Sequence, residues 1–295
     1  MSNIINKIYK ASIWTKVMAI SIILLCIFIA NRPVYNIEGF EQREKLIIKN
    51  DENIYDSFYC SIYDEIKNNP SKNELEASVV INNTLFNKSS KLLDIGSGTG
   101  EHVSIFNKKN INASGIDKSK FMVHFSKEKY NDLKFINGDV NISSTYKPHL
   151  FSHITMFNLT VYELDDKYKV FSNCYEWLKP GGYLIVHFVN KDKYLPPINN
   201  YNPLKLLDNN RNKKIKFNNF DYTNNFEVEN NNAKIKEIFR DKNNKVRQNI
   251  QELNIDSIKN ITNIIKRCGY IQDVIVDLNK MNYQNEFLYF FYKPE

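Results

Sequence analysis

Between residues 91 and 189, short apolar segments alternate with helical patterns, and this alternation constrains the fold more than any other feature of the chain. The expected strands are KLLDIG, INASGID, LKFINGD, FSHITMF and YLIVHFV. Helical spacing separates them, as where Val170, Cys174 and Trp177 share one face. Short apolar strands joined by helices pack as a parallel sheet that is covered on both faces. We therefore expect an α/β fold.

The alternation stops at about residue 190. Three β-leaning segments follow within 190–255, separated by the turn-prone ENNNA and DKNNK, and they predict an inserted antiparallel unit. A last helix is expected around Ile258, Ile261 and Ile265, with Gly269 as its stop. DVIVDLN and EFLYFFYK then predict a closing strand pair.

Composition excludes few classes of function. The 295 residues carry a formal net charge of +7, but the basic residues are spread through an asparagine-rich background, so nucleic acid is not a favoured partner. Cys26, Cys60, Cys174 and Cys268 form no CxxC pair and no cluster with histidine. We expect neither a metal site nor a disulfide framework.

The segment 13–30, IWTKVMAISIILLCIFIA, contains Lys16 as its single charge. Its uninterrupted apolar part is shorter than the ~20 residues that usually cross a bilayer, but Lys16 and Trp14 suit the membrane interface. We predict an uncleaved single-pass anchor through which the chain contacts a membrane. A cleaved signal peptide is the alternative, although Phe28-Ile29-Ala30 lacks the small residue that a cleavage site prefers.

A glycine-rich turn follows the strand that ends at Asp94. Its glycines, Gly96, Gly98 and Gly100, do not have the G-x-G-x-x-G spacing of a dinucleotide site, and Glu101 follows them. Asp94 and Glu101 would repel the phosphates that such a turn normally binds. A suitable ligand carries a carboxylate for the free amides and a cation for Asp94. S-adenosylmethionine (SAM) has both charges and no phosphate.

At this point LLDIGSGTG resembles the first motif of the class I SAM-dependent methyltransferases. In that family an acid after the second strand binds the ribose hydroxyls, and Asp117 matches it; Asp139 in NGDV matches the acid that meets the adenine amino group. LKPGGYLIVHF matches the turn into the fifth strand. The resemblance extends over about 55–293, and it implies a Rossmann-like, seven-stranded, mostly parallel sheet whose last strand is antiparallel.

The resemblance assigns one set of residues to SAM binding. They are Tyr59, Tyr63, Asp94, Gly96, Ser97, Gly98, Gly100, His102, Asp117, Lys118, Gly138, Asp139, Val140, Phe157 and Asn158. The aromatic stretch DSFYCSIYDEI, which contains Phe58, resembles a lead-in that folds over SAM in small-molecule methyltransferases; ordinary helix core is the alternative.

The sequence says less about the methyl acceptor than about the methyl donor, SAM. MFNLTVYEL, which follows the fourth strand, is not the (N/D)PP(Y/F) signature of enzymes that methylate amino groups of DNA, RNA bases or glutamine. We expect a small-molecule or lipid-like acceptor with a nitrogen or oxygen nucleophile. A protein or RNA acceptor, docked by RNKKIK and FRDKNNKVR, is one alternative. A SAM-binding scaffold without turnover is the other.

The sequence does not assign a catalytic residue. His187, Tyr162 and Tyr63 are the candidates, and a structural role in the core is the alternative for His187. Tyr222 and Arg240 are candidate acceptor contacts.

The predicted order along the chain is a tail (1–12), the anchor (13–30), a juxtamembrane linker (31–54) and the methyltransferase domain (55–295), in which 190–255 form a lid. Since SAM is made in the cytosol, we expect the catalytic domain to face the cytosol.

Overall fold

The computed structural model describes residues 12–14, 17–18, 21–22, 46–194, 213–281 and 283–295. The chain divides into two compact units, Met1–Asn36 and Ile37–Glu295. In the first unit, helix is assigned at 13–14, 17–18 and 21–22. Most of the predicted anchor lies outside the described residues, and no helix among those that are described is long and apolar enough to cross a membrane.

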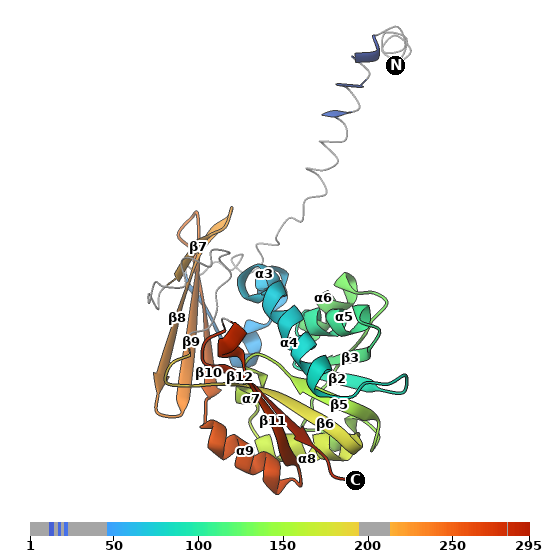
Figure 1. Cartoon of the computed structure of the whole chain (residues 1–295). Coiled ribbons are helices and arrows are strands. Elements are labelled where there is room, and N and C mark those ends of the chain that lie inside the picture. Colours follow the sequence, from blue (N-terminus) through green and yellow to red (C-terminus); the bar gives the residue numbers. More distant parts are fainter. Residues whose placement is uncertain (1–11, 15–16, 19–20, 23–45, 195–212, 282) are drawn as a thin grey trace. The chain divides into compact units, whose positions relative to one another are not determined.

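A seven-stranded sheet forms the centre of the second unit (Figure 1). Its strand order is β11-β12-β6-β5-β2-β3-β4. The bounds are β2 (Lys91–Ile95), β3 (Asn112–Asp117), β4 (Lys134–Asn137), β5 (Phe151–Met156), β6 (Leu178–Val189), β11 (Ile271–Asp277) and β12 (Glu286–Tyr292). Strand β12 runs antiparallel to both of its neighbours, whereas β4, β3, β2, β5 and β6 pair in parallel. The expected Rossmann-like methyltransferase sheet is thereby confirmed.

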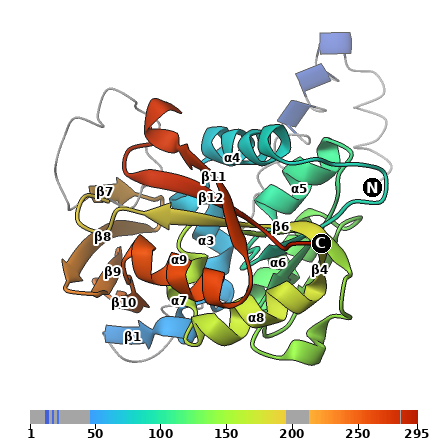
Figure 2. The ribbon, with the colours of Figure 1, turned by 60° about the horizontal axis from the view of Figure 1, so that its bottom comes forward.

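Helices cover both faces of this sheet, as Figure 2 shows for α4 and α5 on one side and α8 and α9 on the other. The side chains of β2 explain this arrangement because they alternate between the two cores: Leu92 packs with α4 and α5, whereas Leu93 packs with α8 and α9. The helices are α3 (Ser57–Lys67), α4 (Pro70–Asn83), α5 (Glu101–Lys108), α6 (Lys120–Lys129), α7 (Thr160–Glu163), α8 (Lys167–Trp177) and α9 (Ile258–Arg267). Three 3₁₀ turns are η2 (Asp51–Ile54), η3 (Ser143–Thr145) and η5 (Leu278–Met281).

A second sheet has the order β1-β10-β9-β8-β7. Its strands are β1 (Leu46–Asn50), β7 (Lys213–Lys216), β8 (Phe220–Glu229), β9 (Asn232–Asp241) and β10 (Val246–Asn254). Strands β7 to β10 are antiparallel, which confirms the inserted unit. Its apolar face, which includes Phe226, Ile235 and Leu253, packs into the same core as α8 and α9.

Strand β1 differs from the linker expected at 31–54. Residues Leu46–Asn50 pair in parallel with β10, and Ile47 is buried there. The sequence LIIKN contains one inward-facing apolar residue between exposed neighbours at a sheet edge, which is too short a pattern to predict a strand.

Candidate active site

A cavity of about 730 Å³ lies at the carboxyl ends of the parallel strands. Ligands of open α/β sheets bind at this edge because the loops after neighbouring strands meet there. The cavity is lined by all of the residues predicted for SAM except Gly100. The first, second, third and fourth predicted strands each contribute the loop that the sequence indicated.

The glycine turn owes its shape to left-handed backbone conformations. Gly96 and Gly100 have φ angles of +67° and +89°, which L side chains rarely adopt. A Cβ atom on Gly100 would lie 2.6 Å from the Phe135 ring. Gly100 precedes α5 and packs against this ring, so it shapes the turn without lining the cavity.

Asp94 is a buried acid without a strong cationic partner. Its carboxylate is 2% exposed and accepts a hydrogen bond from the Thr155 hydroxyl at 2.8 Å. Burial raises the pKa of Asp94 to about 6, against the opposing effects of His102 and Thr155. Among the described residues, no lysine or arginine forms an ion pair with Asp94. The ammonium of SAM would supply the missing positive charge, so this side chain fits the cofactor.

Asp117 and Asp139 occupy the two other acid positions. Asp117 accepts hydrogen bonds from the backbone amides of Gly98 and Ser119, both at 2.9 Å, yet burial raises its pKa. Asp139 accepts from the amide of Asn141 at 2.8 Å, and this bond lowers its pKa. Both carboxylates line the cavity and can accept hydrogen bonds. Ribose hydroxyls and an adenine amino group are donors, so they need such acceptors.

The aromatic stretch DSFYCSIYDEI forms most of α3, and its rings lie in two different environments. Tyr59 and Tyr63 line the cavity. Phe58 instead packs edge-on against Phe220 and Phe239 of the second sheet, with ring centroids 5.7 and 5.5 Å away. The segment therefore contributes side chains both to the cavity wall and to the packing against the second sheet.

His187 and Tyr162, two of the three candidate catalytic residues, do not line the cavity. His187 is fully buried, and both ring nitrogens lie within hydrogen-bond distance of oxygens, Asn158 O at 2.7 Å and Glu286 Oε2 at 2.8 Å. The Tyr162 hydroxyl is buried and accepts from the amide of Val189 at 3.1 Å. Both side chains are occupied in the core, whereas Tyr63, the third candidate, does line the cavity.

The two candidate acceptor contacts also lie elsewhere. Tyr222 is fully buried and donates a hydrogen bond to Glu237 at 2.7 Å. Arg240 does not line the cavity either.

Glu163 is a cavity residue that sequence reasoning missed. It ends α7 and lines the cavity as an exposed residue, and partial loss of hydration there, together with the nearby Asp117, raises its pKa to about 7. The Tyr55 hydroxyl lies 3.4 Å from Glu163 Oε1, and Gln251 of β10 donates to that hydroxyl at 3.0 Å. The signal that could have found it is its place in MFNLTVYEL, directly after the fourth strand of the motif region.

Comparison with known proteins shows which proteins this chain resembles. Residues 93–186 match the family described as a methyltransferase domain. Phosphoethanolamine N-methyltransferase of Plasmodium falciparum (isolate 3D7) is 30% identical over 151 residues, which are 48% of this chain and 56% of that protein. The match thus spans about half the length of this relative.

Solved structures share the fold. The CcbJ methyltransferase from Streptomyces caelestis is 14% identical and superposes with a TM-score of 0.63, covering 83% of this chain and 100% of that one. SAM-bound CalS10, an amino pentose methyltransferase from Micromonospora echinaspora, is 14% identical with a TM-score of 0.53, covering 76% and 89% of the two chains.

Fold, cavity and family match together define a class I SAM-dependent methyltransferase domain, an enzyme domain whose cofactor is SAM.

Proposed function

We propose that this chain methylates a small-molecule or lipid-like acceptor through nitrogen or oxygen, and that an amine is the preferred nucleophile. One observation carries the preference for an amine: an acid with a pKa of about 7, Glu163, lines the cavity beside tyrosines. A cavity-lining carboxylate with a perturbed pKa is typical of a group that binds or moves a proton.

The part of the cavity beyond the predicted SAM residues supports a small acceptor. Its walls include the segment before α3, α7, the segment after β6 and the second sheet, and its lining residues include Tyr55, Glu163, Tyr194, Ile235 and Gln251. Tyrosine rings attract cations through their faces, so this wall suits an ammonium group. The name of the Plasmodium relative also describes methylation of an amine nitrogen.

Each side chain has a definable role in this reaction. SAM, when bound, supplies an electrophilic methyl group whose bond to sulfur breaks as the bond to the acceptor forms, leaving neutral sulfur. Asp94 pairs with a cation and Asp117 accepts from hydroxyls at the donor end of the cavity. Glu163 accepts a proton from the acceptor ammonium, which frees the nitrogen lone pair. The second sheet, through Ile235 and Gln251, limits access of water.

A labelled-methyl assay tests the proposal. The full-length protein, methyl-labelled SAM and a panel of amines, alcohols, RNA and protein are combined, and we expect label on amines. Glu163→Gln should lower kcat/KM for the amine without weakening SAM binding, because the amide cannot accept the proton. Glu176→Gln is the matched control, because Glu176 is an exposed carboxylate of α8. Label on RNA or protein alone would contradict the proposal.

The two alternatives predict different outcomes. For RNA docking, one basic side chain of the FRDKNNKVR segment is unsuitable, because Arg247 is 0% exposed and paired with Asp56. RNKKIK lies partly outside the described residues. A steep salt dependence of binding would favour RNA. Tight SAM binding without labelled product from any extract would favour the scaffold.

We also propose that 13–30 anchors the chain in a membrane, with the catalytic domain in the cytosol. The support is the apolar sequence itself, together with the advantage of a tether near a lipid-like acceptor. The chain should stay in the membrane fraction under alkaline extraction, and charged substitutions in Val17–Ala30 should release it. Glycosylation at Asn82 or Asn158 in cells would contradict the cytosolic orientation.

A further inference from the structure

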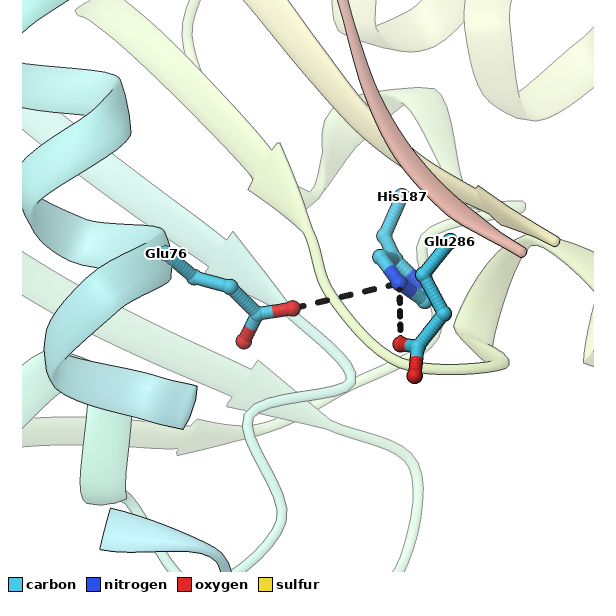
Figure 3. Close-up of side chains that lie close together, drawn as sticks. All are labelled: Glu76, His187 and Glu286. Carbon is cyan, nitrogen blue, oxygen red and sulfur yellow. Dashed lines mark hydrogen bonds and ion pairs between the residues drawn. The ribbon is translucent and has the colours of Figure 1, made fainter. Parts of the chain in front are cut away.

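Four charged or ionisable side chains form a buried quartet behind the cavity. They are Lys72 and Glu76 of α4, His187 of β6 and Glu286 of β12. Their exposed fractions are 2%, 0%, 0% and 4%. Figure 3 shows Glu76, His187 and Glu286 converging from three different elements. These elements are far apart in sequence, so the fold itself assembles the quartet.

The contacts within the quartet are close. Lys72 Nζ lies 2.7 Å from Glu286 Oε2 and 3.4 Å from Glu76 Oε1. His187 Nε2 lies 2.8 Å from Glu286 Oε2 and 3.9 Å from Glu76 Oε1. Each carboxylate therefore faces both nitrogen-bearing side chains.

The surroundings of both carboxylates favour the ionised form. Burial alone would raise the pKa of Glu76, but Lys72 and His102 outweigh it and hold the pKa at about 2. Burial likewise opposes ionisation of Glu286, and Lys72 and His187 together still lower its pKa.

The hydrogen bonds then determine the proton count of His187. Its Nδ1 faces the backbone carbonyl of Asn158, and its Nε2 faces the Glu286 carboxylate. A carbonyl and an ionised carboxylate only accept hydrogen bonds, so both ring nitrogens must donate. His187 is therefore an imidazolium, and the quartet contains two cations and two anions.

This protonation also bears on metal binding. Glu76, His187 and Glu286 offer ligand atoms within 4.8 Å of one another, which is metal-site spacing. A metal, however, needs an unprotonated ring nitrogen, and the Lys72 ammonium contacts both carboxylates. The donor set fits a self-neutralised ion network better than a divalent ion.

Three hydrogen bonds connect the quartet to the cavity wall. His187 donates to the backbone carbonyl of Asn158 at 2.7 Å, and Lys72 donates to its side-chain oxygen at 3.3 Å. Asn158 has a φ angle of +52°, a strained conformation for a residue with a side chain. Glu76 Oε2 lies 2.9 Å from Nε2 of His102, and this acceptor fixes the proton on that nitrogen. Asn158 and His102 both line the cavity.

We propose that Lys72, Glu76, His187 and Glu286 are positioning residues: a metal-free, net-neutral ion quartet, with His187 as an imidazolium, holds Asn158 and His102 in place for methyl transfer. The link to catalysis rests on the proposed function, whereas the charge state of the quartet does not.

Nitrogen NMR on the full-length protein with ¹⁵N-labelled histidine tests the charge state without any acceptor. We expect His187, assigned by the signal lost in His187→Gln, to show two protonated ring nitrogens at neutral pH. His153 is the internal control, because it is buried, pairs with no carboxylate among the residues that the structure describes, and has a pKa that burial lowers to about 4. A neutral tautomer of His187 would overturn the proposal.

Metal titration tests the same claim independently. We expect calorimetry with Zn²⁺ or Mn²⁺ to show no stoichiometric binding that Glu286→Gln abolishes. Stoichiometric uptake that this substitution removes would identify a metal centre and overturn the proposal.

Two single variants and their charge-balanced double variant test whether the quartet positions Asn158 and His102. Lys72→Met and Glu286→Gln each leave one unbalanced buried charge, so kcat should fall about tenfold or more, a loss typical of one charged hydrogen bond. SAM affinity should change less than kcat, and His153→Gln should keep kcat. The double variant restores neutrality, and its midpoint of thermal unfolding should exceed that of either single variant. Full kcat in both single variants, or additive destabilisation in the double, would contradict the proposal.

Discussion

Arg247 of β10 donates two hydrogen bonds to the carboxylate of Asp56, at 3.0 and 2.8 Å, although 191 positions separate the two residues. Asp56 also caps α3 by accepting from the amide of Tyr59. The Arg247 guanidinium lies 4.9 Å from the centre of the Phe58 ring. One ion pair therefore ties the second sheet to the helix that carries Tyr59 and Tyr63.

Replacement of this arginine should destabilise the fold. Arg247→Met removes the two bonds to Asp56, and Asp56 keeps part of its solvent contact, so we expect a loss of about 2 to 3 kcal/mol in the free energy of unfolding. Arg247→Lys should retain only part of that stability, because lysine lacks the planar fork. Urea unfolding measures both changes. A loss below about 0.5 kcal/mol in the methionine variant would show that the pair is unimportant.

SAM binding should weaken in acid because of Asp94. Its raised pKa of about 6 means that the carboxylate becomes protonated as the pH falls through that value. A protonated Asp94 cannot pair with an ammonium, so Kd should rise up to about tenfold for each pH unit below 6. Calorimetry across this range measures the effect. A Kd that stays constant from neutral pH down to about pH 5 would argue against Asp94 as the ammonium partner.

Methyl transfer should depend on pH through Glu163. Only the ionised form accepts a proton, so kcat/KM for an amine should rise with pH through about 7. Glu163→Gln should abolish that rise while leaving weaker, flatter activity. The profile of the wild type and the variant is the measurement, and an identical rise in both would assign the titration to another group.

The sequence predicted the parts of the site that depend on local position. Asp94, Asp117 and Asp139 each follow a short apolar strand, and parallel strands place their carboxyl ends at one edge. The glycine turn was recognisable because left-handed backbone conformations favour glycine at Gly96 and Gly100. The local sequence is enough to predict such features, because they do not depend on residues that are distant in the chain.

The features that the sequence did not predict depend on distant residues. His187 suggested a base from its place in the fifth predicted strand, but Glu286, 99 positions away, occupies its ring. Glu163 gains its raised pKa from loss of hydration at the cavity together with Asp117, which ends β3. Residues Leu46–Asn50 form strand β1 because they pair with β10 at the edge of the second sheet. Only the assembled fold brings these pairs into contact.

Asp94 and Asp117 are the two side chains on which SAM binding should depend most directly. Titration calorimetry of SAM into the full-length protein, and into its Asp94→Ala and Asp117→Ala variants, measures this. We expect binding by the wild type, a Kd at least about tenfold higher in each variant, and no change in the exposed control Asp132→Asn. Unchanged affinity in both alanine variants would contradict the assignment of the site.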